Sequence, residues 1–386
     1  MNNPIKAHQE CKGKIEVVSR IEVTSKDDLS TYYTPGVAEP CLEIEKNPKK
    51  SFTYTRRQNL IAVITDGSAV LGLGNIGALA SMPVMEGKAM LFKTMADVDA
   101  VPLSINTQDT QELIKTIQLI SQNFAGINLE DISAPRCFEI EKTLQDTLDI
   151  PVFHDDQHGT AIVLYAALTN ALKLVDKSID KVKIVINGAG AAGTAITEFL
   201  LEAGAKNMIV CDKFGILNSN DSTLSHEHMA LAEKTNPSKL KGNLSDALID
   251  SDVFIGVSKG HLVTKQMINS MHDKPIIFPM ANPIPEISVE DLKDTKAYIV
   301  GTGSSKYPNQ INNLLAFPGI FRGALDSHAS KITKEMMLAA SLAIASSITP
   351  SIYQIIPDAL DPHVHKKVAS AVYETALKHQ VPKTHE

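Results

Sequence analysis

The chain has 386 residues, of which 44% are hydrophobic and 21% are charged, a composition typical of a folded protein with about two domains. A formal net charge of -7, an aromatic content of 5% and the lack of tryptophan argue against a nucleic-acid partner, which needs a basic surface and stacking rings. No apolar run in the sequence could span a bilayer and the N-terminus lacks the apolar core of a signal peptide, so we expect a cytoplasmic protein without a membrane partner.

The first 150 residues are rich in turn signals. The segments YYTPGVAEP and ITDGSAVLGLGNIG combine glycine, proline and aspartate, and a helix is predicted over residues 110–123. We interpret residues 1–155 as an N-terminal α/β domain. A long helical pattern over residues 160–175 is expected to connect this domain to a second one, residues 156–386.

The second domain alternates short β-branched runs with amphipathic stretches, the pattern of parallel strands joined by helices. Strands are predicted over residues 181–186, 207–212, 252–258, 275–281 and 297–303. Ser245 and Thr264 are the expected N-caps of two of the intervening helices. The fold class is therefore α/β, with a doubly wound Rossmann-type parallel sheet. After Phe317, C-terminal helices are expected to return to the first domain.

A glycine-rich turn of the form GxGxxG follows the strand KVKIVIN and opens a helix, which is the context of a dinucleotide site. The turn consists of Gly188, Gly190, Ala191, Ala192 and Gly193. Gly188 permits a tight turn, Gly190 lets a diphosphate approach the backbone, and Gly193 allows the helix to pack on the strand. Asp212 ends the next strand, where an acid binds a ribose hydroxyl and favours NAD over NADP. Lys213 could instead hold a ribose phosphate, so both cofactors stay open.

A second GxGxxG, formed by Gly72, Gly74 and Gly77, lacks a following strand that ends in an acid at the usual distance. We interpret it as a packed glycine turn rather than a second nucleotide site.

Two acidic pairs follow apolar runs: Glu130 with Asp131, and Asp155 with Asp156. Such carboxylates could bind a hard divalent cation, although acidic pairs are more often solvated loop ends. His154 and His158 flank the second pair, but the sequence has no HExxH motif and no thiolate pair nearby. We expect these histidines to make local hydrogen bonds rather than to bind zinc.

Several segments together resemble the malic enzyme family, specifically its shorter bacterial members. They are YYTPGVAEPC, TDGSAVLGLGNIG, MPVMEGKAMLFK, LEDISAPRCFEIE, PVFHDDQHGTAIV, GAGAAG, MANPIPEI and INNLLAFPGIFRGAL. They occur in the family's order and cover nearly the whole chain. The resemblance implies oxidative decarboxylation of L-malate to pyruvate and carbon dioxide, with NAD or NADP and with Mg²⁺ or Mn²⁺. It also implies a homodimer or a higher homo-oligomer.

The resemblance also implies roles for individual residues. Tyr33 corresponds to a general acid, and Lys88 to a general base that also contacts the substrate. The implied metal ligands are Glu130, Asp131 and Asp156, with Asp155 as an additional catalytic carboxylate. Asn282 corresponds to a residue that contacts both substrate and nucleotide, and either Asn312 or Asn313 to a second substrate-binding asparagine.

Two other functions remain open at this point. The same site could decarboxylate oxaloacetate without net redox change, which the intact glycine turn and Asp212 do not favour. A non-catalytic protein that only binds NAD would leave the acidic pairs, Tyr33 and Lys88 without a role.

Overall fold

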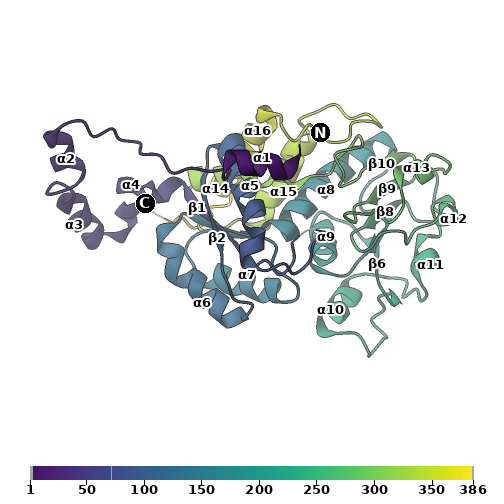
Figure 1. Cartoon of the computed structure of the whole chain (residues 1–386). Helices are drawn as coiled ribbons and strands as arrows, with labels where there is room; N and C mark the ends of the chain where they lie inside the picture. Colours follow the sequence, from purple (N-terminus) through teal and green to yellow (C-terminus); the bar gives the residue numbers. More distant parts are fainter. Residues whose placement is uncertain (1–2, 71, 385–386) are drawn as a thin grey trace.

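The computed structural model describes residues 3–70 and 72–384, and it contains two β-sheets (Figure 1). In the first sheet the strands β1 (Leu60–Thr65), β2 (Asp99–Ser104), β3 (Gly126–Leu129) and β4 (Val152–His154) are parallel, in the order β2-β1-β3-β4. The residues of β1, β3 and β4 are largely buried on both faces, as expected for parallel strands covered by helices, whereas those of the edge strand β2 are only partly buried. The helices of this half are α5 (Ala78–Ala96), α6 (Thr110–Ile120) and α7 (Arg136–Thr147).

Strand register places the acidic pairs at one edge of this sheet. Leu129 at the end of β3 pairs with His154 at the end of β4. Glu130 with Asp131, and Asp155 with Asp156, are the residues that follow these two positions. Because parallel strands end at the same edge, residues distant in sequence meet there.

Helix α8 (Asp155–Leu174) connects the two halves of the molecule and is longer than the predicted 160–175 segment, because it begins directly at the end of β4. Thirteen of its twenty residues are buried, so most of its circumference is covered by other elements. The prediction of a connecting helix is confirmed, and the predicted domain boundary near residue 155 falls at its first turn. That boundary itself remains a prediction.

The second sheet has the order β10-β9-β8-β5-β6-β7. The strands are β5 (Lys183–Asn187), β6 (Asn207–Asp212), β7 (Gly215–Ile216), β8 (Val253–Gly256), β9 (Ile276–Pro279) and β10 (Ile299–Val300), and only β7 pairs antiparallel. The intervening helices are α9 (Ala191–Glu202), α10 (His226–Lys234), α11 (Leu244–Leu248), α12 (Lys265–Asn269) and α13 (Val289–Leu292). All five predicted strands are confirmed.

Of the two predicted helix caps, Thr264 is confirmed and Ser245 is wrong. The side chain of Asn243 accepts hydrogen bonds from the amides of Ser245 and Asp246, and the Asp246 side chain accepts the Asn243 amide in return. This reciprocal capping box starts α11 one residue before Ser245.

The C-terminal helices are α14 (Phe317–Asp326), α15 (Lys334–Ala345) and α16 (Pro362–Lys378). Helix α14 packs against α5 and the first sheet: the ring of Phe317 lies 4.8 Å from that of Phe92, and the ring of Phe321 lies 5.3 Å from Phe92 and 6.0 Å from Phe153. Edge-on ring contacts of this kind stabilise a core beyond the area they bury. The expected return of the C-terminal helices to the first half is therefore confirmed.

The N-terminal segment contains α1 (Pro4–Cys11), α2 (Lys26–Tyr32), α3 (Ala38–Lys46) and α4 (Ser51–Tyr54). Figure 1 shows α1 beside the body of the molecule, whereas α2 and α3 project from it at the purple end of the chain. None of the helices in the described ranges is long and apolar enough to cross a membrane.

Candidate active site

A cleft of about 520 Å³ lies between the two halves of the molecule. Its walls come from the carboxyl edge of the first sheet, the start of α9 and the loops that follow β8, β9 and β10. Ligands of α/β proteins bind at such an edge, outside the carboxyl ends of the strands. Seven of the predicted site residues line the cleft: Asp131, Asp156, Ala191, Ala192, Asn282, Asn312 and Asn313.

Lys88 does not line the cleft itself; its side chain is 8% exposed and lies among the acidic pairs. Its Nζ donates to Asp155 Oδ2 at 2.5 Å, lies 2.9 Å from Glu130 Oε1, and sits 4.0 Å from the centre of the Phe317 ring. Helix α5, helix α8, strand β3 and helix α14 thus converge on one ammonium group. Burial lowers the pKa of Lys88, but the carboxylates of Asp155 and Glu130 outweigh this effect and raise the pKa above its usual value.

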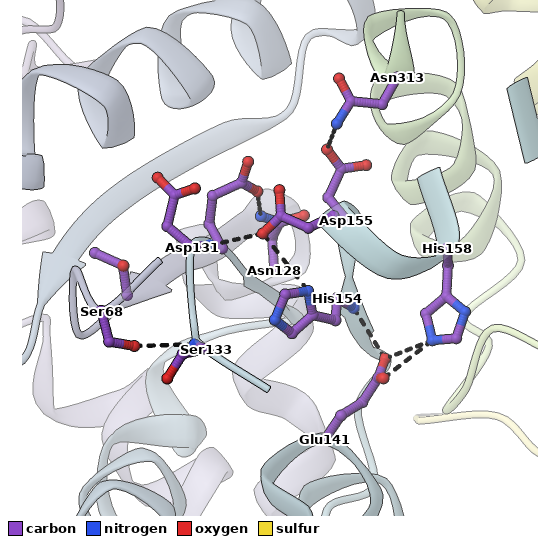
Figure 2. A network of polar contacts seen from close by, with 12 residues as sticks. Ser68, Asn128, Asp131, Ser133, Glu141, His154, Asp155, His158 and Asn313 are labelled. Carbon is purple, nitrogen blue, oxygen red and sulfur yellow. Dashed lines mark hydrogen bonds and ion pairs between the residues drawn. The ribbon is translucent and has the colours of Figure 1, made fainter. Parts of the chain in front are cut away.

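The site contains more carboxylates than positively charged groups. Burial raises the pKa of Glu130 to about 7, that of Asp155 to about 7 and that of Asp156 to about 6, although Lys88 lowers each of them. Three carboxylates face one ammonium, so at least one of them favours its neutral form unless a further cation is bound. Figure 2 shows how closely Asp131, Asp155 and their neighbours are gathered.

The donor set therefore suits a hard divalent cation, since carboxylate oxygens are the ligands that Mg²⁺ and Mn²⁺ prefer. Within residues 3–70 and 72–384, however, no three acidic, histidine or cysteine side chains already form a ligand cluster. The reason is visible in the contacts: Glu130 is turned toward Lys88, while Asp156 Oδ2 accepts the Asp131 amide at 2.7 Å.

Of the two histidines, His158 behaves as predicted and His154 does not. His158 Nε2 lies 3.0 Å from both carboxylate oxygens of Glu141, a contact that Figure 2 shows. His154 is 1% exposed, and neither ring nitrogen finds a hydrogen-bond partner among the described residues; Nδ1 lies 3.8 Å from Asp156 Oδ2. Burial lowers the pKa of His154 to about 4, so its ring is neutral. The expectation of a local hydrogen bond was wrong for His154.

The glycine turn has the geometry of a diphosphate cradle. Gly188 has φ +125°, and a Cβ on Gly193 would lie 1.7 Å from the Gly188 carbonyl oxygen, so neither position accepts a side chain. A Cβ on Gly190 would meet nothing within 4 Å. Gly190 is the N-cap of α9 and contributes no capping side chain. The first amides of α9, including those of Ala191 and Ala192, are thus accessible to an anion.

Asp212 is the last residue of β6, the strand that follows the glycine turn and α9. Its Oδ1 accepts the Phe214 amide at 2.7 Å, and its Oδ2 lies 3.5 Å from Nδ1 of His228. Lys213 stacks on the exposed Phe214 ring, with Nζ 4.8 Å from the ring centre. These contacts hold the Asp212 carboxylate in place.

The three asparagines lie together in the cleft, as the resemblance implies. Asn313 Nδ2 donates to Asp155 Oδ2 at 2.5 Å, whereas Asn312 uses its side-chain oxygen to cap its own helical turn at the Leu314 amide. The loop that carries Asn282 is anchored by the buried Glu286, which accepts the amides of Ala281 and Ser258.

The structure does not bring Tyr33 to this site. Tyr33 ends helix α2 on the projecting segment and is 66% exposed. Seven of the other predicted residues line the cleft, whereas the site of a single chain lacks the phenol that the family resemblance places there.

Sequence reasoning missed three residues that shape the site. Asn128 donates to Glu130 Oε2 at 2.9 Å, and Glu286 anchors the asparagine loop. A Cβ on Gly159 would lie 2.0 Å from Asp155 Oδ1, so only glycine leaves room for that carboxylate. The role of Asn128 could have been predicted, because it lies two residues before Glu130 and side chains two apart on a strand point to the same face. Gly159 and Glu286 depend on contacts between distant segments.

The second GxGxxG forms a compact turn between β1 and α5. Val70 and Gly74 form an isolated bridge, and the amides of Ile76 and Gly77 both donate to the Gly67 carbonyl at 3.1 Å. The turn closes on its own backbone, but it is not packed as predicted: Gly72 and Gly74 are exposed, and a Cβ on Gly74 or Gly77 would meet nothing within 4 Å.

Comparison with known proteins identifies the family. Residues 12–145 match the family described as malic enzyme, N-terminal domain, and residues 157–377 match malic enzyme, NAD binding domain. The chain belongs to the malic enzyme family. The resemblance seen in the sequence, the α/β fold class and the nucleotide-binding second half are thereby confirmed.

Individual members of the family are similar to this chain over almost its whole length. An NAD-dependent malic enzyme of Geobacillus stearothermophilus is 52% identical over 95% of this chain and 77% of its own length. A probable NADP-dependent malic enzyme of Rickettsia prowazekii is 47% identical over 95% of this chain, which spans only 50% of that protein. The crystal structure of the NAD-dependent malic enzyme of Thermotoga maritima is 48% identical, with a TM-score of 0.94 over 97% of this chain and 99% of that one.

Proposed function

We propose that this chain catalyses the oxidative decarboxylation of L-malate to pyruvate and carbon dioxide with reduction of a nicotinamide nucleotide. The observation that carries the proposal is a single cleft that is lined both by Asp131 and Asp156, next to the buried cluster around Lys88, and by Ala191 and Ala192 at the start of α9. Relatives named as NAD- and NADP-dependent malic enzymes support it. The held carboxylate of Asp212 favours NAD, because it would repel a ribose phosphate.

Lys88 is the proposed general base. Once Lys88 has lost its own proton, its neutral Nζ can accept the proton of the C2 hydroxyl while a hydride leaves C2 for the nicotinamide, which gives a ketone at C2. Asn282 and Asn313 face the same cleft and offer amide donors to the substrate carboxylates, and Asn312 stands beside them. Loss of the C4 carboxylate as carbon dioxide then leaves an electron pair on C3. The family resemblance assigns the donation of the final proton to Tyr33, which within one chain lies away from the cleft.

The charge balance explains why this chemistry needs a cation. A Mg²⁺ or Mn²⁺ ion held by Glu130, Asp131 and Asp156 would act as a Lewis acid toward the substrate oxygens and offset the carboxylate charge that raises the pKa of Lys88. Asp155 holds the Lys88 side chain and the Asn313 amide in fixed positions.

The two alternatives fit the molecule less well. An oxaloacetate decarboxylase without redox change has no need for the cradle at Gly188, Gly190 and Gly193 or for Asp212. A protein that only binds NAD has no need to bury Lys88 among carboxylates, an arrangement that costs desolvation free energy.

The test is a spectrophotometric assay of reduced nicotinamide with L-malate and Mn²⁺, run with NAD and with NADP, with and without a chelator. We expect chelator-sensitive reduction, one pyruvate per reduced nucleotide, and a preference for NAD. Lys88→Ala should abolish turnover, whereas Lys142→Ala, a control at an exposed lysine on α7, should not. Metal-dependent decarboxylation of oxaloacetate without any malate oxidation would contradict the proposal.

A further inference from the structure

The side chain of His228 lies between two parts of the nucleotide site that are distant in sequence. Its Nε2 lies 3.3 Å from the carbonyl oxygen of Ala189, in the glycine turn between β5 and α9. Its Nδ1 lies 3.5 Å from Oδ2 of Asp212, at the end of β6. One imidazole therefore contacts both the turn expected to bind the diphosphate and the carboxylate expected to bind the ribose.

The first turn of helix α10 places His228 at this position. Ser225 is the N-cap of α10, and its Oγ accepts the amide of His228 at 3.2 Å. This cap fixes the backbone from which the imidazole extends. The side chain of His228 is 29% exposed and that of Asp212 is 11% exposed. Solvent therefore screens the charges of this pair only in part.

Both neighbours of the imidazole accept hydrogen bonds. The carbonyl oxygen of Ala189 is an acceptor, and so is the carboxylate of Asp212. A neutral imidazole has one N–H and can satisfy one of them, whereas an imidazolium has an N–H on each nitrogen. Only the doubly protonated ring can donate through Nε2 to Ala189 and also present an N–H to Asp212. The contacts therefore suit a positively charged group beside the Asp212 carboxylate.

Lys213 is the cation next to Asp212 in sequence, but its ammonium lies over a different group. Its Nζ is 4.8 Å from the centre of the Phe214 ring, and that ring is largely exposed. Among the residues that the structure describes, His228 is the one basic side chain with a nitrogen within 4.0 Å of the Asp212 carboxylate. The cation at the ribose end of the site thus comes from α10 and not from the residue beside Asp212.

We propose that His228 is a specificity-determining residue of the nucleotide site: it ties the glycine turn to Asp212, and its charge sets how strongly the site discriminates against a ribose phosphate. The inference rests on the proposed function, because it takes the glycine turn and Asp212 as the nucleotide site. Asp212 repels the additional phosphate of NADP, and the imidazolium of His228 offsets part of that repulsion because opposite charges at this distance compensate each other. The site thereby prefers NAD without excluding NADP.

A histidine with only a structural role would behave differently. If His228 merely held α10 against the glycine turn, its loss would weaken the binding of NADH and NADPH equally, because the two nucleotides share the diphosphate. If its charge acts at the ribose, its loss weakens NADPH more than NADH, since only NADPH carries the additional phosphate. The ratio of the two dissociation constants separates these roles, and measuring it requires no turnover.

The experiment follows the fluorescence of NADH and NADPH on binding, at about pH 6, where histidine side chains carry much of their charge. The chain contains no tryptophan, so tryptophan emission does not interfere. His228→Gln keeps an N–H for the Ala189 carbonyl but removes the charge, whereas His228→Leu removes both. His226→Gln is the matched control, at an exposed histidine two residues earlier on the same helix.

We expect His228→Gln to bind NADH within about twofold of wild type and to raise the Kd for NADPH at least about threefold, as for the loss of a partly exposed charge pair. His228→Leu should raise the ratio of the NADPH Kd to the NADH Kd by a similar factor and also weaken both nucleotides. His226→Gln should leave both constants unchanged.

An unchanged ratio in both His228 variants, whatever happens to the individual constants, would overturn the proposal. A ratio that changes as much in His226→Gln as in His228→Gln would overturn it too, because the effect would then not depend on the contact with Asp212. A wild-type chain that binds neither nucleotide would remove the proposed function and this inference with it, an outcome that the wild-type titration alone reveals.

Discussion

Gly190 and Gly193 stand three residues apart in the same turn, yet alanine should affect them in opposite ways. A Cβ on Gly193 would lie 1.7 Å from the Gly188 carbonyl oxygen, far inside the 3.0 Å that real Cβ contacts respect. The obstacle is backbone, so no side-chain rotation relieves it. Overpacking costs about 1–3 kcal/mol, and more where the backbone must shift, while alanine in a helix gains about 1 kcal/mol over glycine. We expect Gly193→Ala to lose about 2 kcal/mol of unfolding free energy.

At Gly190 a Cβ meets nothing within 4 Å, and the backbone angles φ -82° and ψ -165° are ordinary for alanine. Folding free energy should therefore stay within about 0.5 kcal/mol of wild type. The same methyl group, however, would stand where the nucleotide diphosphate must approach the amides of α9. We expect the Kd for the nucleotide to rise at least about tenfold, which is about 1.4 kcal/mol.

Thermal unfolding and titration with NADH fluorescence measure the two effects on the same samples. The reasoning fails if Gly193→Ala is as stable as wild type, since the clash would then be absorbed without cost. It also fails if Gly190→Ala unfolds normally and binds nucleotide with wild-type affinity, because the turn would then not be the diphosphate cradle.

Three further predictions follow from single contacts. Gly159→Ala should lower kcat at least about tenfold, because its Cβ displaces the Asp155 carboxylate from Lys88; unchanged turnover would mean that this contact is not needed. Asp212→Ala should raise KM for NAD and reduce the preference over NADP, as measured by kcat/KM with each nucleotide; an unchanged ratio would remove Asp212 as the selector. Burial lowers the pKa of His365 below its usual 6.5, so the unfolded chain binds more protons and stability falls as pH falls below 6.5; His365→Gln should flatten this slope in urea unfolding at pH 5 and pH 7, and an identical slope would refute it.

Local patterns in the sequence were sufficient for the second half of the molecule. Each predicted strand there is a short apolar run whose both faces are buried, and the glycine turn lies between a strand and a helix that adjoin in sequence. Backbone conformation and burial at such sites depend on neighbours a few residues away. The same locality accounts for the error at Ser245, where Asn243 offered the stronger reciprocal cap.

The surroundings of Lys88 could be inferred only by resemblance, and their physics only from the fold. Nothing near Lys88 in sequence predicts an ammonium buried among Glu130 and Asp155, because those carboxylates arrive at the ends of other strands. The space that Gly159 leaves for the Asp155 carboxylate likewise became apparent only in the folded structure. The direction of the Lys88 pKa follows from these distant partners and not from the residues beside it in the chain.

The sequence by itself determined the family, the strand and helix pattern of the nucleotide-binding half and the residue types of the site, because these are properties of local pattern and of motif order. Only the tertiary structure decided which of those residues meet. It gathered the carboxylates around Lys88 through parallel strand register, and it left Tyr33 exposed on the projecting N-terminal segment. Contacts between distant segments depend on how whole sheets and helices pack, and that packing is not encoded in any one stretch of the chain.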